Sequence, residues 1–131
     1  MKTHVIVSAI IKNEGKYLIG KRSNSKQFSP NEWEFISGFI DTPESAEETI
    51  LREIQEELNT EGIISKAGET YTVTDKETRW IVIPFNVKLK NTKVNANPSD
   101  HSELKWVNKE ELASIKELKN DFYILNSRKM I

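Results

Sequence analysis

Three glutamates, Glu53, Glu56 and Glu57, lie close together in the segment Arg52-Glu53-Ile54-Gln55-Glu56-Glu57. In a helix, three- and four-residue spacing places their carboxylates on one face, where like charges repel one another. Clustered carboxylates are the ligands that hard cations such as Mg²⁺ and Mn²⁺ require. An acidic face that is merely solvated is the alternative interpretation.

The wider spacing favours metal binding over a solvated face. Gly38 is followed by five residues, Glu44, seven residues and then the Arg-Glu-aliphatic-any-Glu-Glu segment. This pattern over residues 38–60 resembles the Nudix box, so the chain resembles the Nudix hydrolase family. The resemblance implies that the box forms a loop-helix-loop and that the cofactor is Mg²⁺, with Mn²⁺ as a substitute.

The resemblance and the chemistry of phosphoanhydride cleavage together suggest catalytic roles. Cleavage by water requires neutralised phosphate charge, an activated water and a stabilised leaving phosphate, all of which bound Mg²⁺ can supply. We expect Glu53, Glu56 and Glu57 to hold the metal and one of them to orient or deprotonate the water. Arg52 is expected to hold carboxylates in place, with Glu44 as its salt-bridge partner.

Gly38 is expected to let the backbone approach the metal or phosphate closely. Four residues around the box depart from the family pattern. Asn59 replaces the second glycine and Thr60 the closing aliphatic residue, while Ser37 and Ile36 replace a frequent glycine and proline. Asn tolerates the left-handed conformation, so we expect a modified helix exit and retained metal binding.

Two segments outside the box extend the resemblance. Trp33-Glu34-Phe35 looks like the lead-in of MutT-like nucleoside triphosphate pyrophosphohydrolases, and residues 101–107 look like the family's late strand. Glu103 stands where relatives often carry a further acidic ligand or base, and a plain surface glutamate is an equal alternative. Asp100 is a rival for the same role.

Substrate contacts are suggested by three residues. Arg22 and Arg79 lie at strand ends that resemble the positions of phosphate- or base-contacting arginines in MutT-like enzymes, and solvated arginines are the alternative. Asn120, expected in a loop before the last helix, resembles an asparagine that reads a purine edge, although a turn or N-cap is an alternative. His4 and His101 are too far apart in sequence to suggest a zinc site, so structural or surface roles are expected.

Six aromatic residues could include a platform that stacks on a base. Most of them must belong to the core in a domain of this size. They are Trp33, Phe35, Tyr71, Trp80, Phe85 and Trp106.

The box requires a helix to position its charges. Thr42 is the expected N-cap and Pro43 the first helical residue, because proline lacks the N–H that this position leaves unused. Glu44 to Leu58 is the predicted helix, and Asn59 ends it in a left-handed conformation. Its predicted buried stripe consists of Ala46, Thr49, Ile50, Ile54 and Leu58.

The remaining pattern predicts an α/β (α+β) fold, and the resemblance implies a mixed β-sheet sandwiched between helices. His4 to Ile11 is apolar at even and odd positions, which is typical of a strand covered on both faces. Lys16 to Arg22 is expected to pair with it antiparallel. Pro84 suggests an edge or a bulge in a later strand. The other predicted strands are Trp33 to Ile36, Glu69 to Thr74, Arg79 to Leu89 and Leu104 to Val107, and the other predicted helices are Lys109 to Ser114 and Asp121 to Arg128.

Length and composition limit the possible classes. The 131 residues suit one domain spanning residues 1–131. A net charge of -1 without blocks of like charge indicates no nucleic-acid partner. With no cysteine, disulfides, zinc-thiolate sites and thiol nucleophiles are excluded. We expect a cytoplasmic protein without a membrane segment.

The leading hypothesis is an enzyme that converts a (d)NTP or oxidised (d)NTP to nucleoside monophosphate and pyrophosphate. The substrate is then a small nucleotide, and the protein is a monomer or homodimer. A dinucleoside polyphosphate, nucleotide sugar, ADP-ribose or capped RNA end is an alternative substrate. A non-catalytic nucleotide-sensing module is a further alternative, although such modules commonly lose box glutamates and this chain has kept all of them.

Overall fold

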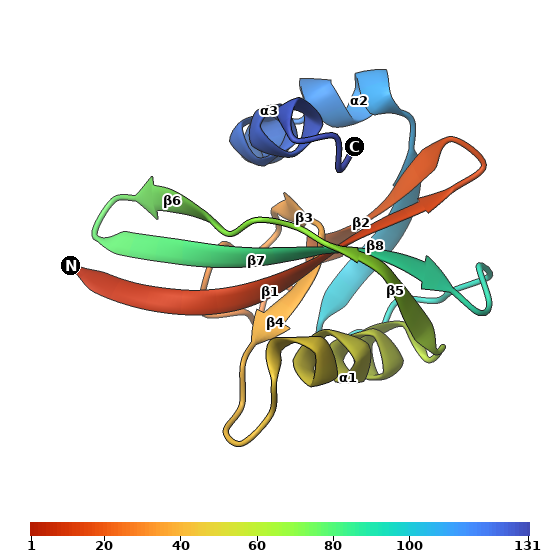
Figure 1. The fold of residues 1–131 in the computed structure, drawn as a ribbon, viewed down its shortest axis with the longest axis horizontal. Coiled ribbons are helices and arrows are strands. Elements are labelled where there is room, and N and C mark those ends of the chain that lie inside the picture. The colour runs from red at the N-terminus through yellow and green to blue at the C-terminus, as the bar shows by residue number, and fades with distance from the viewer.

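The computed structural model describes residues 1–131, which form a mixed sheet with helices on both faces (Figure 1). Helix α1 covers one face, and α2 and α3 cover the other (Figure 1). The predicted α/β (α+β) sandwich is therefore confirmed. The strands are β1 (Lys2–Asn13), β2 (Lys16–Arg22), β3 (Trp33–Glu34), β4 (Ile36–Phe39), β5 (Gly62–Ala67), β6 (Tyr71–Asp75), β7 (Thr78–Leu89) and β8 (His101–Val107), and the helices are α1 (Ala46–Leu58), α2 (Lys109–Ser114), α3 (Lys119–Ser127) and a 3₁₀ turn, Lys116–Leu118.

β1 is the central strand, as its unbroken apolar sequence predicts. It pairs in parallel with β7 and antiparallel with β4. Ala9 packs in one core cluster with Ile50 and Ile54 of α1, whereas Ile10 packs in the other cluster with Leu125 of α3. Successive side chains of β1 thus enter opposite cores. Burial of a large apolar side chain in either core stabilises the folded state by about 1.5–3 kcal/mol.

The hairpin between β1 and β2 is confirmed, but it is short. Only Lys12↔Tyr17 and Asn13↔Lys16 are paired, across a turn in which Glu14 and Gly15 have positive φ. Beyond this point β2 diverges from β1 and pairs with β3 and β8.

The predicted start of α1 is wrong. Ser45, not Thr42, is the N-cap: its hydroxyl accepts from the Glu48 N–H at 3.1 Å, and Glu48 Oε1 accepts from the Ser45 N–H at 2.9 Å. A capping box satisfies two free helix-end groups at once, and Thr42 has Ser45 rather than Glu three residues later. Glu44 therefore precedes the helix. Asn59 ends it with φ 53° and ψ 42°, as predicted.

Pro84 suggested an edge or a bulge in β7; the edge is wrong, whereas the pairing of β7 with β5 does contain a bulge or irregularity, between Ile64 and Lys66. β7 is flanked by β1 on one side and by β5 and β6 on the other. Pro84 faces the junction between β5 and β6, where its carbonyl accepts from the Gly68 N–H at 2.9 Å. Pro84 pairs with Ser8 on the β1 side, and its missing N–H is tolerated because no residue of β5 or β6 pairs with it on the other side. β5 itself was not predicted, since residues 62–67 alternate too weakly.

The remaining elements differ in their bounds. The predicted strand Trp33 to Ile36 is split into β3 and β4, and β8 begins at His101 rather than Leu104. The last helix begins at Lys119, so Asn120 lies in α3 and not in a loop. None of the helices has the length and hydropathy of a membrane span.

Candidate active site

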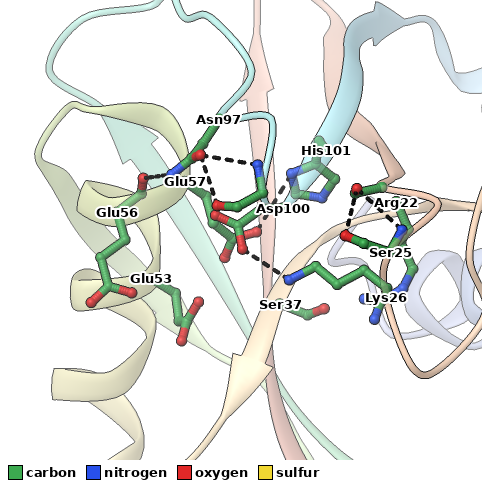
Figure 2. A network of polar contacts seen from close by, with 12 residues as sticks. Arg22, Ser25, Lys26, Ser37, Glu53, Glu56, Glu57, Asn97, Asp100 and His101 are labelled. Atoms are coloured by element: carbon green, nitrogen blue, oxygen red, sulfur yellow. Dashed lines mark hydrogen bonds and ion pairs between the residues drawn. The ribbon is translucent and has the colours of Figure 1, made fainter.

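A cleft of about 470 Å³ lies where α1 faces β4 and the loop that precedes β8. All three clustered glutamates of α1 line it, together with Gly38 and Arg22. In Figure 2 the Glu53 and Glu57 side chains extend from α1 toward Ser37 and His101. The structure thus brings the predicted acidic cluster to a hollow large enough for a small-molecule ligand.

Arg52 lies among four carboxylates. Its Nε donates to Glu44 Oε2 at 2.8 Å, as predicted from the sequence, and its Nη1 donates to Glu53 Oε1 at 3.0 Å and Glu56 Oε2 at 3.1 Å. Its Nη2 contacts Asp41 Oδ2 at 3.3 Å. The hydrogen bond to Glu44 raises the pKa of Arg52, and Arg52 lowers the pKa of Glu44. One guanidinium therefore offsets the repulsion within the cluster.

Glu57 differs from its neighbours because it is buried. The residue is 3 % exposed, and its Oε2 has no hydrogen-bond partner. Burial raises the pKa of Glu57 well above its usual value of 4.5, and the carboxylates of Glu53 and Glu34 raise it further. A buried carboxylate without a donor is costly, so this oxygen requires either a proton or a cation.

Gly38 lies against the acidic cluster rather than in a strained turn. A Cβ at this position would collide with the Glu53 side chain. Glycine is therefore required so that strand β4 and the Glu53 carboxylate can pack together. The group that the Gly38 backbone approaches in the structure is the Glu53 side chain.

The wall opposite α1 is built around Glu34, which the sequence did not single out as a site residue. Its Oε1 accepts from Arg22 Nη1 at 2.9 Å and from the Ser37 hydroxyl at 3.0 Å. Its Oε2 lies 2.9 Å from His101 Nε2. Arg22, which lines the cleft as expected, also donates to the Phe28 carbonyl at 2.8 Å.

The loop before β8 is fixed to α1 by Asn97. Its Nδ2 donates to the Glu56 carbonyl at 3.1 Å, and its own carbonyl accepts the N–H groups of Asp100 and His101 at 2.9 and 2.8 Å (Figure 2). These bonds hold Asp100 in the cleft, where it pairs with Lys26 Nζ at 3.0 Å. Glu103 is exposed on β8 and does not line the cleft. Asp100, rather than Glu103, is therefore the acidic residue beside the box.

Two expected substrate contacts lie outside the cleft. Arg79 is exposed and donates to the Thr3 hydroxyl at 3.1 Å, whereas the adjacent Trp80 lines the cleft. Successive strand residues point to opposite faces of the sheet. A prediction that is wrong by one residue therefore places the contact on the wrong face. Asn120 is exposed on α3, and its neighbour Asp121 lines the cleft instead.

Asp121 is held by Tyr71, whose hydroxyl donates to Asp121 Oδ1 at 2.7 Å. Burial is the main reason that the pKa of each group is raised, and the charge of Asp121 raises the pKa of Tyr71 further. Nearby, Phe28 packs edge-on against Trp80 with ring centroids 5.1 Å apart. The cleft therefore combines an acidic end on α1 with polar and aromatic groups elsewhere.

The model of the NUDIX domain family matches residues 2–126. The chain belongs to this family. The nucleoside triphosphatase NudI of Escherichia fergusonii is 27 % identical over 124 residues, which cover 86 % of this chain and 87 % of that protein. A MutT protein from Methanosarcina mazei has a crystal structure with a TM-score of 0.85 at 24 % identity, covering 98 % of this chain and 95 % of that one. The solution structure of the E. coli ORF135 protein gives 0.71 at 26 % identity, covering 97 % and 93 %.

The protein is therefore a Nudix hydrolase with MutT-like structural relatives. Nudix enzymes act on small nucleotide substrates and generally use a divalent metal. The residues present fit such a cation: three carboxylates line the cleft, and a buried oxygen of Glu57 has no hydrogen-bond partner. Carboxylate oxygens are the donors that Mg²⁺ and Mn²⁺ prefer.

Proposed function

We propose that this Nudix hydrolase converts a nucleoside triphosphate, normal or oxidised, to nucleoside monophosphate and pyrophosphate in the presence of Mg²⁺. The observation that carries the proposal is the unpartnered, buried Glu57 Oε2 beside Glu53 and Glu56 in the cleft. The similarity to a protein named as a nucleoside triphosphatase supports this substrate class. The family match over residues 2–126 supports our proposal that residues 1–131 form one domain.

The acidic cluster is the proposed metal site, with Glu53, Glu56 and Glu57 as carboxylate ligands and Gly38 providing the backbone approach. When bound, Mg²⁺ supplies charge neutralisation and water activation. Arg52 holds Glu53 and Glu56 in a fixed orientation through its Nη1 bonds. Such prior positioning lowers the reorganisation that accompanies reaction.

In the metal-free protein, Glu57 is the box glutamate that is proposed to hold a proton. Its carboxyl has a raised pKa because it is buried and surrounded by other carboxylates. Asp100 is the proposed further acidic residue of the site in place of Glu103, since only Asp100 reaches the cleft.

The substrate is proposed to lie along the cleft, with its phosphates toward α1. Arg22 is the cleft-lining arginine that can contact a phosphate oxygen, although Glu34 already neutralises part of its charge. Phe28 and Trp80 are aromatic residues of the cleft that are proposed to contact a base. Arg79 and Asn120 are not proposed as substrate contacts, because both side chains are exposed outside the cleft.

The proposal is tested with the purified chain, Mg²⁺ and a panel of normal and oxidised (d)NTPs, diadenosine tetraphosphate and nucleotide sugars. We expect turnover of at least one triphosphate and a loss of about 10³-fold in Glu57→Gln, since metal-ion catalysis contributes several kcal/mol. Glu47→Gln is the matched control, because Glu47 lies on the exposed first turn of α1. It should retain wild-type turnover.

Turnover of a dinucleoside polyphosphate or a nucleotide sugar alone would contradict the proposed substrate class and retain the Nudix chemistry. Tight nucleotide binding by calorimetry without any product would instead identify a nucleotide-sensing module.

A further inference from the structure

His101, the first residue of β8, is fully buried with an exposed fraction of 0 %. Its Nε2 lies 2.9 Å from Glu34 Oε2. A carboxylate accepts hydrogen bonds and has none to donate, so Nε2 carries the ring proton in the neutral imidazole. The lone pair of the ring therefore lies on Nδ1.

Nδ1 points toward the box. It has no hydrogen-bond partner and lies 3.6 Å from Glu57 Oε1, while Glu57 Oε2 is also without a partner (Figure 2). Nδ1 and one carboxylate oxygen of Glu57 thus lie close together, and each of these buried side chains carries an acceptor atom without a partner. An unsatisfied buried polar group destabilises the fold, and a purely structural histidine would avoid this by pairing both nitrogens.

The neighbouring strand leaves room for the ring in this orientation. A Cβ at Gly20 would lie within 2.5 Å of the His101 ring. Together with the bond to Glu34, this contact fixes the imidazole against β2. The ring cannot turn Nδ1 toward another donor without losing the Glu34 bond.

The arrangement matches that of a metal-binding histidine. Such a histidine usually donates its other ring N–H to a carboxylate, which fixes the tautomer and the ring orientation. Two ligand atoms at about 2.1 Å from one ion, with a bond angle of about 90–120°, lie about 3.0–3.6 Å apart. The 3.6 Å between Nδ1 and Glu57 Oε1 lies at the upper end of that range. Glu34, Glu57 and His101 also offer donor atoms within 4.8 Å of one another.

We propose that His101 Nδ1 and the Glu57 carboxylate form a mixed nitrogen-oxygen site for a divalent transition-metal cation such as Mn²⁺, Co²⁺ or Zn²⁺, with Glu34 orienting the imidazole. An imidazole ligand favours these ions over Mg²⁺, which binds oxygen donors. Glu57 also belongs to the carboxylate cluster of the cleft. It is the one residue through which this site rests on the proposed function. The chain then discriminates between cations through a histidine that lies outside the Nudix box.

Electron spin-echo envelope modulation of the Mn²⁺-loaded protein tests the proposal, because it detects a directly coordinated imidazole nitrogen. The chain has only two histidines, His4 and His101. We expect the ¹⁴N coupling in the wild type and in the matched control His4→Gln, and its loss in His101→Gln. By calorimetry, His101→Gln should weaken Co²⁺ binding by about 10–100-fold and leave Mg²⁺ binding within about twofold.

Failure of Mn²⁺ to bind, binding without a ¹⁴N coupling, or loss of the coupling in His4→Gln would each overturn the proposal. If His101→Gln does not fold, the His4→Gln variant still tests the proposal, because His101 is the only histidine in that variant. Nucleotide turnover with Mg²⁺ is measured separately. A ¹⁴N coupling without turnover of any nucleotide would contradict the proposed function alone, and turnover without the coupling would contradict this metal site alone.

Discussion

Glu57 illustrates how stability and chemistry compete at a single residue. Its carboxyl is buried, lacks a donor on Oε2 and faces other acidic groups. The uncharged form suits this environment, whereas metal binding requires the charged form. The buried stripe predicted for α1 did not include Glu57, whose side chain is nevertheless buried and lies beside His101.

This competition predicts the pH dependence of stability in metal-free protein. The folded state raises the pKa of Glu57 above its value in the unfolded chain. As pH rises from the unfolded pKa of Glu57 to its higher folded pKa, the unfolded chain loses the proton before the folded protein does. The free energy of unfolding of the wild type therefore falls over this range. Glu57→Gln should therefore be the more stable protein at pH 8 with a chelator present.

The measurement is the urea midpoint of both proteins between pH 4 and pH 8. The advantage of Glu57→Gln should shrink as pH falls toward the unfolded value of about 4.5 and vanish below it. An advantage that grows as pH falls would contradict the burial of an uncompensated carboxyl.

Arg52 and its partner Glu44 show what sequence can predict at this scale. Their contact follows from a known box spacing, and the 2.8 Å bond confirms it. Glu34 and His101 are 67 residues apart, and neither belongs to a local pattern. Their contact depends on the pairing of β2 with both β3 and β8, which no spacing within either segment encodes.

At the scale of elements, the start of α1 sets the direction in which the box presents its charges. Ser45 and Glu48 form the capping box, whereas Thr42 lies outside the helix. The sequence contains both candidates. Preference for Thr42-Pro43 came from the proline at the first helical position, and the reciprocal pair of hydrogen bonds at Ser45 outweighs it.

Two alanine variants separate these alternatives. Ser45→Ala should lower the free energy of unfolding by about 1 kcal/mol, the usual effect of losing an N-cap. Thr42→Ala should change it by less than about 0.5 kcal/mol, as expected for an exposed residue. Urea denaturation of both variants provides the measurement, and a larger loss in Thr42→Ala would contradict the observed helix start.

Strand parity explains the other differences between sequence and structure. β7 was predicted correctly as a strand, yet Trp80 and not Arg79 faces the cleft. Likewise, β8 was predicted, but its earlier start at His101 turns Glu103 to solvent and leaves Asp100 in the cleft. Strand sequences identify the element more readily than the face that carries function, because a shift of one residue reverses every side chain.

At the scale of the whole molecule, the cleft depends on the divergence of β1 and β2. β1 joins β4 and β7, while β2 joins β3 and β8, and α1 covers the space beside them. Residues from α1, β2, β4 and the loop held by Asn97 therefore meet at one place. The box sequence alone predicts the acidic side of this cleft, and the opposite side follows from the tertiary fold.

The central claim is that this cleft uses a metal held by the box glutamates to release pyrophosphate from a nucleoside triphosphate. Phosphorus-31 NMR of a triphosphate incubated with the protein tests it most directly, because pyrophosphate and orthophosphate give separate signals. We predict nucleoside monophosphate and pyrophosphate with the wild type and Glu47→Gln in Mg²⁺, release slower by about 10³-fold with Glu57→Gln, and no product with a chelator. Nucleoside diphosphate and orthophosphate as products, or undiminished turnover in Glu57→Gln, would contradict the claim.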